Sequence, residues 1–163
     1  MIVSLADLPR IRKRLSDKTI VFACGTFDLI HPGHVDFLEW CSQQGDALVV
    51  AINSDHLVRK RKGPSRPIQN KADRMRMVAA LKAVTYVVSK HYALNSRIAS
   101  IMTAELLRPD VVVLGHDWGA EEIEEWRCHL PNTHIIIGPP REAGRSTSHI
   151  ISRIQERHGK TAA

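Results

Sequence analysis

Short apolar stretches alternate with amphipathic stretches along most of this chain. The apolar stretches are rich in β-branched residues, as buried parallel strands are, and they cover residues 19–24, 47–52, 84–88, 111–114 and 134–137. Between and after them, apolar positions recur at helical spacing in residues 35–43, 74–81, 95–107 and 148–157. This alternation predicts the α/β class, with a doubly wound, five-stranded parallel sheet and helices on both of its faces.

The length of the chain favours one domain. A chain of 163 residues can bury a hydrophobic core, and the sequence contains no internal repeat or linker. We expect a single domain over residues 1–163, with residues 1–18 as an N-terminal extension and residues 159–163 as a frayed tail. No apolar run approaches the roughly 20 residues that span a bilayer, and the N-terminus has no signal-peptide core. These features predict a cytoplasmic protein with no membrane partner.

The cysteines agree with a reducing compartment. Cys24, Cys41 and Cys128 are far apart in the sequence and form no CxxC pair. Neither a disulfide framework nor a zinc site is therefore indicated. Cys24 and Cys41 lie in apolar surroundings, and we expect both to be buried as small apolar residues.

Basic residues outnumber acidic ones, 23 to 17, which gives a formal net charge of +6. Basic residues form two clusters, at residues 10–14 and 59–62. Residues 61–70, which begin within the second cluster, are irregular, and we expect them to form a basic loop over a site. Only 5% of the residues are aromatic, so nucleic-acid bases would find few side chains on which to stack. The charge favours a small polyanionic ligand; a basic RNA-binding module is the alternative class.

The most informative stretch joins the first predicted strand to the first predicted helix. It reads Gly-Thr-Phe-Asp-Leu-Ile-His-Pro-Gly-His over residues 25–34, so His31 and His34 stand where the helix begins. In an open α/β sheet, ligands bind beyond the carboxyl ends of the strands, and a helix N-terminus offers unpaired N–H groups that suit phosphate. Two imidazoles at that place can donate hydrogen bonds to a phosphate whose charge grows in a transition state.

Residues 31–34, His-Pro-Gly-His, resemble the HxGH signature of the nucleotidyltransferase superfamily. With Gly-Thr-Phe-Asp at 25–28 they are similar to its cytidylyltransferase-like branch, which includes glycerol-3-phosphate cytidylyltransferase, the adenylyltransferase domain of ADP-heptose synthase and archaeal FAD synthetase. The resemblance extends over residues 19–157. It implies a single Rossmann-like nucleotidyltransferase domain, in which an acceptor phosphate attacks the α-phosphorus of a nucleoside triphosphate and pyrophosphate leaves.

Two segments in the middle of the chain carry the resemblance further. Residues 59–63, Arg-Lys-Arg-Lys-Gly, stand where the family has a lysine that reaches phosphates; Lys62 is the best match and Lys60 the second. Residues 66–76 resemble a stretch of the heptose-phosphate adenylyltransferases that begins with Arg-Pro. Arg74 aligns with the arginine that opens a helix there, and its guanidinium fork would suit an acceptor phosphate.

Two later segments resemble the CTP-using enzymes instead. Residues 115–118, Gly-His-Asp-Trp, are similar to the GDDW run of glycerol-3-phosphate cytidylyltransferases, with His116 in place of an aspartate. Residues 141–148 resemble their RTEGISTT run, with Arg145 in place of an apolar residue. Hydroxyls at such a loop-to-helix junction can bind phosphate or simply cap the helix.

The resemblance implies a role for each matched position. It assigns catalysis of the transfer to His31, His34 and Lys62. It assigns nucleotide binding to Gly25, Thr26, Phe27, Gly33, Gly115, Asp117, Arg141, Gly144, Ser146 and Thr147. It assigns acceptor binding to Asp28, Lys60, Arg74 and Trp118. Asp28 can equally cap its own loop and Trp118 can equally be packing. Mg²⁺ is expected to arrive on the triphosphate, with mostly water ligands and no protein metal site.

Different segments of the sequence favour different pairs of substrates. The first and last matched segments favour CTP and a small phosphorylated polyol or phosphonate as acceptor. The alternative is ATP with heptose 1-phosphate or FMN, which residues 53–88 favour. A non-catalytic nucleotide-binding regulator is an alternative from a different class of function. Family members of this size commonly form homodimers, which is the assembly we expect.

Overall fold

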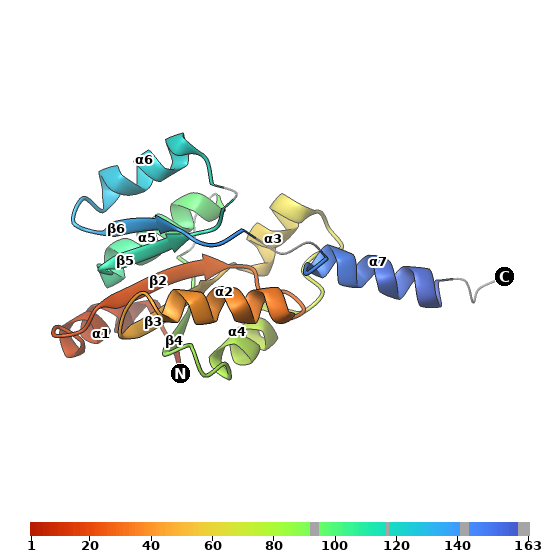
Figure 1. The fold of residues 1–163 in the computed structure, drawn as a ribbon, viewed down its shortest axis with the longest axis horizontal. Helices are drawn as coiled ribbons and strands as arrows, with labels where there is room; N and C mark the ends of the chain where they lie inside the picture. Colours follow the sequence, from red (N-terminus) through yellow and green to blue (C-terminus); the bar gives the residue numbers. More distant parts are fainter. Residues whose placement is uncertain (92–94, 117, 141–143, 160–163) are drawn as a thin grey trace.

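The computed structural model describes residues 1–91, 95–116, 118–140 and 144–159. Its strands and helices alternate along most of the chain (Figure 1). In chain order they are β1 (Ile2–Val3), the 3₁₀ turn η1 (Leu5–Asp7), α1 (Leu8–Arg14), β2 (Ile20–Gly25), α2 (Pro32–Ser42), β3 (Ala47–Ile52), α3 (Asp55–Lys62), α4 (Lys71–Ala79), β4 (Tyr86–Ser89), α5 (Ser96–Leu107), β5 (Val111–Leu114), α6 (Ala120–His129), β6 (His134–Ile137) and α7 (Thr147–His158).

All strand pairs in the described sheet are parallel, and the strand order is β1-β4-β3-β2-β5-β6. The predicted α/β class and doubly wound sheet are confirmed, with six strands in place of five. The additional strand is β1, whose two residues pair with Val87 and Val88 of β4. Two residues are too few to show a periodic pattern, so only the pairing with β4 defines this strand.

Alternating strand residues fill a separate core on each face of the sheet. Ile20 and Phe22 of β2 belong to the core under α1, α5 and α6, where Trp126 is fully buried. Val21 and Ala23 belong to the core under α2 and α4. Successive side chains of a strand point to opposite faces, so these strands are apolar throughout because both faces are covered by helices.

The N-terminal residues are part of this architecture. Leu8 and Ile11 of α1 are buried in the first core. Arg12 of α1 forms an ion pair of 2.7 Å with Asp110, whose carboxylate also accepts a hydrogen bond from the backbone N–H of Ile20. Residues 1–18, expected as an extension, therefore supply an edge strand and a packed helix.

The basic run at residues 59–62 is the last turn of α3, so the loop expected there begins only at Gly63. Ser54 caps this helix by accepting a hydrogen bond from Leu57 N, and Leu57 and Val58 are buried. Four cations in the last turn face the negative end of the helix dipole, which offsets part of their mutual repulsion. The prediction of a loop over residues 61–70 was therefore wrong for Arg61 and Lys62, which the capped helix includes.

The four predicted helices correspond to α2, α4, α5 and α7, whereas α1, α3 and α6 were not predicted. Asn95 caps α5 by accepting a hydrogen bond from Ile98 N. α7 extends away from the sheet (Figure 1). No helix among the described residues has the length and apolar character needed to cross a membrane.

All three cysteines are free. Cys41 is buried as expected, and burial, reinforced by Cys24, raises the pKa of its thiol to about 12. Cys24 is only half-buried, and Cys128 is exposed. The expectation that Cys24 is fully buried was wrong, because its side chain borders the cavity described below.

Candidate active site

A cavity of about 380 Å³ opens at the carboxyl ends of β2, β3, β4 and β5. β2 lies in the middle of the sheet, with β3 on one side and β5 on the other. The direction of winding changes between β2 and β5, and ligands of doubly wound proteins bind at such a crevice. The fold thus places the cavity where a ligand is expected.

The two histidines lie at the start of α2, on the wall of this cavity. His31 has an extended backbone and precedes Pro32, the first residue of the helix, while His34 lies in its first turn. Their rings stack with centroids 3.7 Å apart, and the Phe27 ring lies 5.3 Å from that of His34. Phe27 and Leu29 both have positive φ, +51° and +48°. Such a backbone costs about 1–3 kcal/mol per residue and is typical of functional loops.

A second helix N-terminus meets the first at the cavity. Ser146 caps α7 by accepting a hydrogen bond from His149 N, and Thr147 Oγ1 donates to the carbonyl of Asp28 at 2.7 Å. A Cβ on Gly33 would lie only 3.2 Å from the Arg145 carbonyl, so glycine allows the two segments to approach closely. Two N-termini that converge in this way suit the phosphates of one polyanionic ligand.

One side of the cavity is cationic. Arg61 and Lys62 reach it from the end of α3, and Lys90 reaches it from the residue after β4. Lys62 was predicted, whereas Arg61 and Lys90 were missed. A polar residue directly after an apolar strand was the available signal for Lys90. Lys60 does not line the cavity: it is exposed, at a different angle around α3, and its predicted role in acceptor binding has no support from this position.

The other side of the cavity is largely apolar. Phe37 and Trp40 contribute from α2, and Pro139 and Pro140 follow β6. The residues after β5 complete this side with Gly115, His116 and Trp118. Flat apolar side chains of this kind can contact the faces of a nucleobase.

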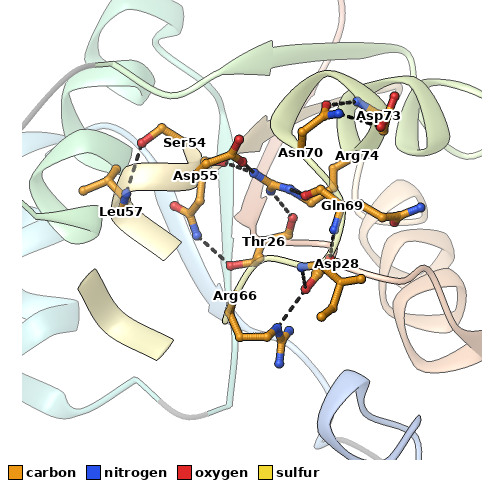
Figure 2. Close-up of polar contacts among 12 residues, drawn as sticks. Thr26, Asp28, Ser54, Asp55, Leu57, Arg66, Gln69, Asn70, Asp73 and Arg74 are labelled. Atoms are coloured by element: carbon orange, nitrogen blue, oxygen red, sulfur yellow. Dashed lines mark hydrogen bonds and ion pairs between the residues drawn. The ribbon is translucent and has the colours of Figure 1, made fainter. Parts of the chain in front are cut away.

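Asp28 holds the loop that follows α3, so its carboxylate is not presented to an acceptor as predicted (Figure 2). The side chain accepts hydrogen bonds from Arg66 Nε and from the backbone N–H groups of Ile68 and Gln69, each at 2.9 Å. Burial alone would raise the pKa of Asp28, but these hydrogen bonds, led by the two backbone donors, outweigh it and hold the pKa below its ordinary value of 3.8.

Replacing Asp28 with asparagine is expected to destabilise the fold by about 1–3 kcal/mol at pH 7, because hydrogen bonds to a buried charged group are lost. The pKa of Asp28 is lower in the folded protein than in the unfolded chain, so its carboxylate stabilises the fold at pH values above the pKa of the unfolded chain. This stabilisation is lost as the pH falls through the pKa of the folded protein. The difference between Asp28→Asn and the wild type should therefore shrink below about pH 4. Urea unfolding at pH 7 and pH 3 measures it, with exposed Asp17→Asn as the control; an equal difference at both pH values would contradict the assignment.

Arg74 is fully buried and does not reach the cavity, which corrects its predicted role as an acceptor ligand. Its guanidinium donates to the backbone carbonyls of Thr26, Asn53 and Gln69 and pairs with Asp55 at 2.7 Å (Figure 2). Arg74 therefore ties the end of β2 to the end of β3. It stabilises the backbone at the cavity without lining the cavity.

The cavity brings together most of the predicted site residues. Those on its wall are Gly25, Thr26, Phe27, Asp28, His31, Gly33, His34, Lys62, Gly115, Trp118, Ser146 and Thr147. Gly144 is off the wall and has a φ of +78°, which suits glycine in the turn before α7. Asp117 and Arg141 lie outside the described residues. The wall residues that were not predicted include Asp36, Asn53, Arg61, Lys90, His116 and Arg145.

Converging helix N-termini and a cationic wall suit the phosphates of a nucleotide, and an HxGH pair at the switch point is typical of nucleotidyltransferases. The sequence model of the cytidylyltransferase-like family matches residues 22–153. The chain belongs to this family.

Curated relatives of this chain carry the name bifunctional protein HldE. The protein from Azorhizobium caulinodans is 40% identical over 134 residues, which are 82% of this chain and 27% of the relative. The protein from Koribacter versatilis is 42% identical over 133 residues, 78% of this chain and 26% of the relative. This chain therefore spans less than a third of the length of these relatives.

Solved structures share the fold. A lipopolysaccharide core biosynthesis protein from Thermoplasma volcanium GSS1 is 26% identical, with a TM-score of 0.64 over 77% of this chain and 99% of that one. A pantoate-beta-alanine ligase from Francisella tularensis has a TM-score of 0.65 over 93% of this chain and 72% of that one, at 16% identity. The second likeness shows only that the Rossmann-like fold is common to both.

Proposed function

We propose that this protein is an adenylyltransferase, which transfers AMP from ATP to the phosphate of heptose 1-phosphate and releases pyrophosphate. The observation that carries the proposal is the likeness to HldE proteins, at 40% and 42% identity in the two cases above. Residues 53–88, which resemble the heptose-phosphate adenylyltransferases, support the same substrates. We place the reaction in the cytoplasm and expect a homodimer.

The cavity supplies positioning and charge, which is what transfer of a nucleotidyl group requires. We assign His31 and His34 to the oxygens of the α-phosphoryl group, where charge develops during in-line attack. Lys62 and the N-terminus of α7, with Ser146 and Thr147, suit the β- and γ-phosphates. The base would then lie on the apolar side, against residues such as Trp40. No protein nucleophile takes part.

Mg²⁺ belongs to the proposal as an ion that enters with the triphosphate and neutralises phosphate charge. Two acidic side chains lie on the described part of the cavity wall, and both have other partners: Asp28 binds Arg66, and Asp36 pairs with Arg145 at 2.5 Å. Among the described residues, no three His, Cys, Asp or Glu side chains cluster as a metal site would need. Phosphate oxygens and water are the ligands that fit this wall, and Mg²⁺ readily keeps several waters.

A nucleotide screen tests the proposal. With Mg²⁺ present, ATP at a hundredfold excess over its Kd should stabilise the fold by about 2.7 kcal/mol, which raises the Tm by about 5–10 °C for a domain of this size. CTP, GTP and UTP should each give a much smaller shift. Addition of heptose 1-phosphate to ATP should then release pyrophosphate. A shift with CTP alone would contradict the proposal.

CTP with a small phosphorylated polyol is the second candidate. Gly-His-Asp-Trp at 115–118 and the Arg-x-x-Gly-x-Ser-Thr pattern at 141–147 favour it, because both resemble CTP-using enzymes. The same screen distinguishes the two candidates, with glycerol 3-phosphate replacing heptose 1-phosphate in the second step.

A further inference from the structure

Lys90 is a buried cation on the cavity wall to which the resemblance assigns no role. It follows β4 directly, its backbone N–H donates to the carbonyl of Ile52 in β3, and the residue is only 6% exposed. Its ammonium donates to Ser96 Oγ at 3.1 Å. Ser96 Oγ in turn donates to Asn53 Oδ1 at 2.7 Å, and Asn53 Nδ2 donates to Thr26 Oγ1 at 3.1 Å. This chain of hydrogen bonds fixes Lys90 across the ends of three strands.

The charge of Lys90 is not compensated within the described part of the chain. None of the ion pairs found there includes this residue, although buried ammonium groups are usually paired. Burial lowers the pKa of Lys90, and the nearby Arg61 lowers it further, while Cys24 acts in the opposite direction. A second cation beside a buried one is unfavourable until an anion binds between them.

Lys90 lies on the side of the cavity away from the nucleobase side. The strand order places β4 two strands from β2, so their ends are about 10 Å apart at the usual strand spacing of about 4.8 Å. The apolar wall lies beyond β2, next to β5 and β6. The Lys90 side chain approaches Cys24 near the end of β2, and both residues line the same cavity as His31. An anion bound by Lys90 would therefore share the cavity with the phosphates assigned to the histidine pair.

We propose that Lys90, together with Arg61, binds the phosphate of the acceptor and holds it beside the histidine pair. The proposal rests on the function proposed above and adds a substrate-binding residue to it. A phosphate monoester is the chemical class that fits, because a compact dianion can bridge the Lys90 ammonium and the Arg61 guanidinium. The Ser96–Asn53–Thr26 chain aligns the ammonium, so the acceptor is positioned for attack and not merely attracted.

Calorimetry with Lys90→Met tests this assignment. The titrants are α,β-methylene-ATP with Mg²⁺, and then inorganic phosphate added to protein saturated with that analogue. Loss of a charged hydrogen bond should weaken phosphate binding by at least about tenfold, while the Kd of the analogue changes by less than about threefold. Because an uncompensated buried charge is removed, the Tm without ligand should equal or exceed that of the wild type. Lys90→Gln, which keeps a donor for Ser96, should behave in the same way if the methionine variant does not fold.

Lys82→Met is the matched control, because Lys82 is exposed and precedes the same strand. Its phosphate affinity should equal that of the wild type. Unchanged phosphate binding in both Lys90 variants, or an equal loss of analogue binding, would overturn the assignment.

Kinetics separate this inference from the proposed function. If heptose 1-phosphate is a substrate, Lys90→Met should raise its KM by about 10- to 100-fold and leave the KM of ATP unchanged. If heptose 1-phosphate is inert but phosphate binding still depends on Lys90, the proposed acceptor is wrong and the Lys90 site stands. A reactive heptose 1-phosphate with an unchanged KM in the variant leaves the function standing and removes Lys90 from it.

Discussion

Replacing His34 with alanine is expected to lower kcat by about 10²- to 10³-fold, which is typical for loss of one preorganised donor to a developing charge. The variant should still fold and bind ATP. His34 is half-buried in the first turn of α2, where its ring stacks on His31 and contacts Phe27. Alanine preserves the helix, so the loss should appear in the transition state and not in stability. Pyrophosphate release under saturating substrates measures kcat, and thermal unfolding with and without ATP measures folding and binding.

His56→Ala provides the control, because His56 is an exposed residue of α3 that is not on the cavity wall. Its kcat should remain at the wild-type value. The His31→Ala, His34→Ala double variant should lose less than the product of the two single losses, since stacked groups that act on one phosphate are not independent. A His34→Ala enzyme with nearly normal turnover would remove this pair from the chemistry.

The central strands that the sequence predicts share one physical property. β2, β3 and β5 are covered on both faces, so their residues are apolar in succession and form a local signal. β1 carries no such signal, because an edge strand of two residues exists only through its pairing with β4. β6, at the opposite edge, was predicted because three consecutive isoleucines form such a signal. Local patterns therefore miss an edge strand where it is too short to show one.

Some residues of the candidate site are likewise predicted by local sequence patterns and others are not. The histidine pair and Ser146 are predictable because each stands at a junction between elements, where the sequence itself marks a helix N-terminus. Lys90 follows an apolar strand, which is a local signal, but only the strand order and the length of α3 bring Lys90 and Arg61 into the same cavity. The direction in which a long cation points depends on its tertiary partners.

Arg74 shows most clearly that the direction of a long cation depends on its tertiary partners. Arg74→Met is expected to destabilise the fold by about 3–5 kcal/mol, because the substitution removes one member of a buried ionic network. The backbone carbonyls of Thr26, Asn53 and Gln69 would lose their donor, and the Asp55 carboxylate its ion-pair partner. For a domain of this size the Tm should fall by about 10 °C. Differential scanning calorimetry without ligand measures this effect.

Arg76→Met, two residues further along α4 and exposed, should change the Tm by no more than about 2 °C. Arg74→Lys should lie between the two, since an ammonium keeps the charge but cannot reach all four acceptors in the planar geometry of a guanidinium. If Arg74 instead held the acceptor phosphate, as its place in the sequence suggests, Arg74→Met would raise the KM of the acceptor without lowering the Tm. Its complete burial favours the structural outcome, because a side chain with no exposed surface cannot bind a substrate that arrives from solvent.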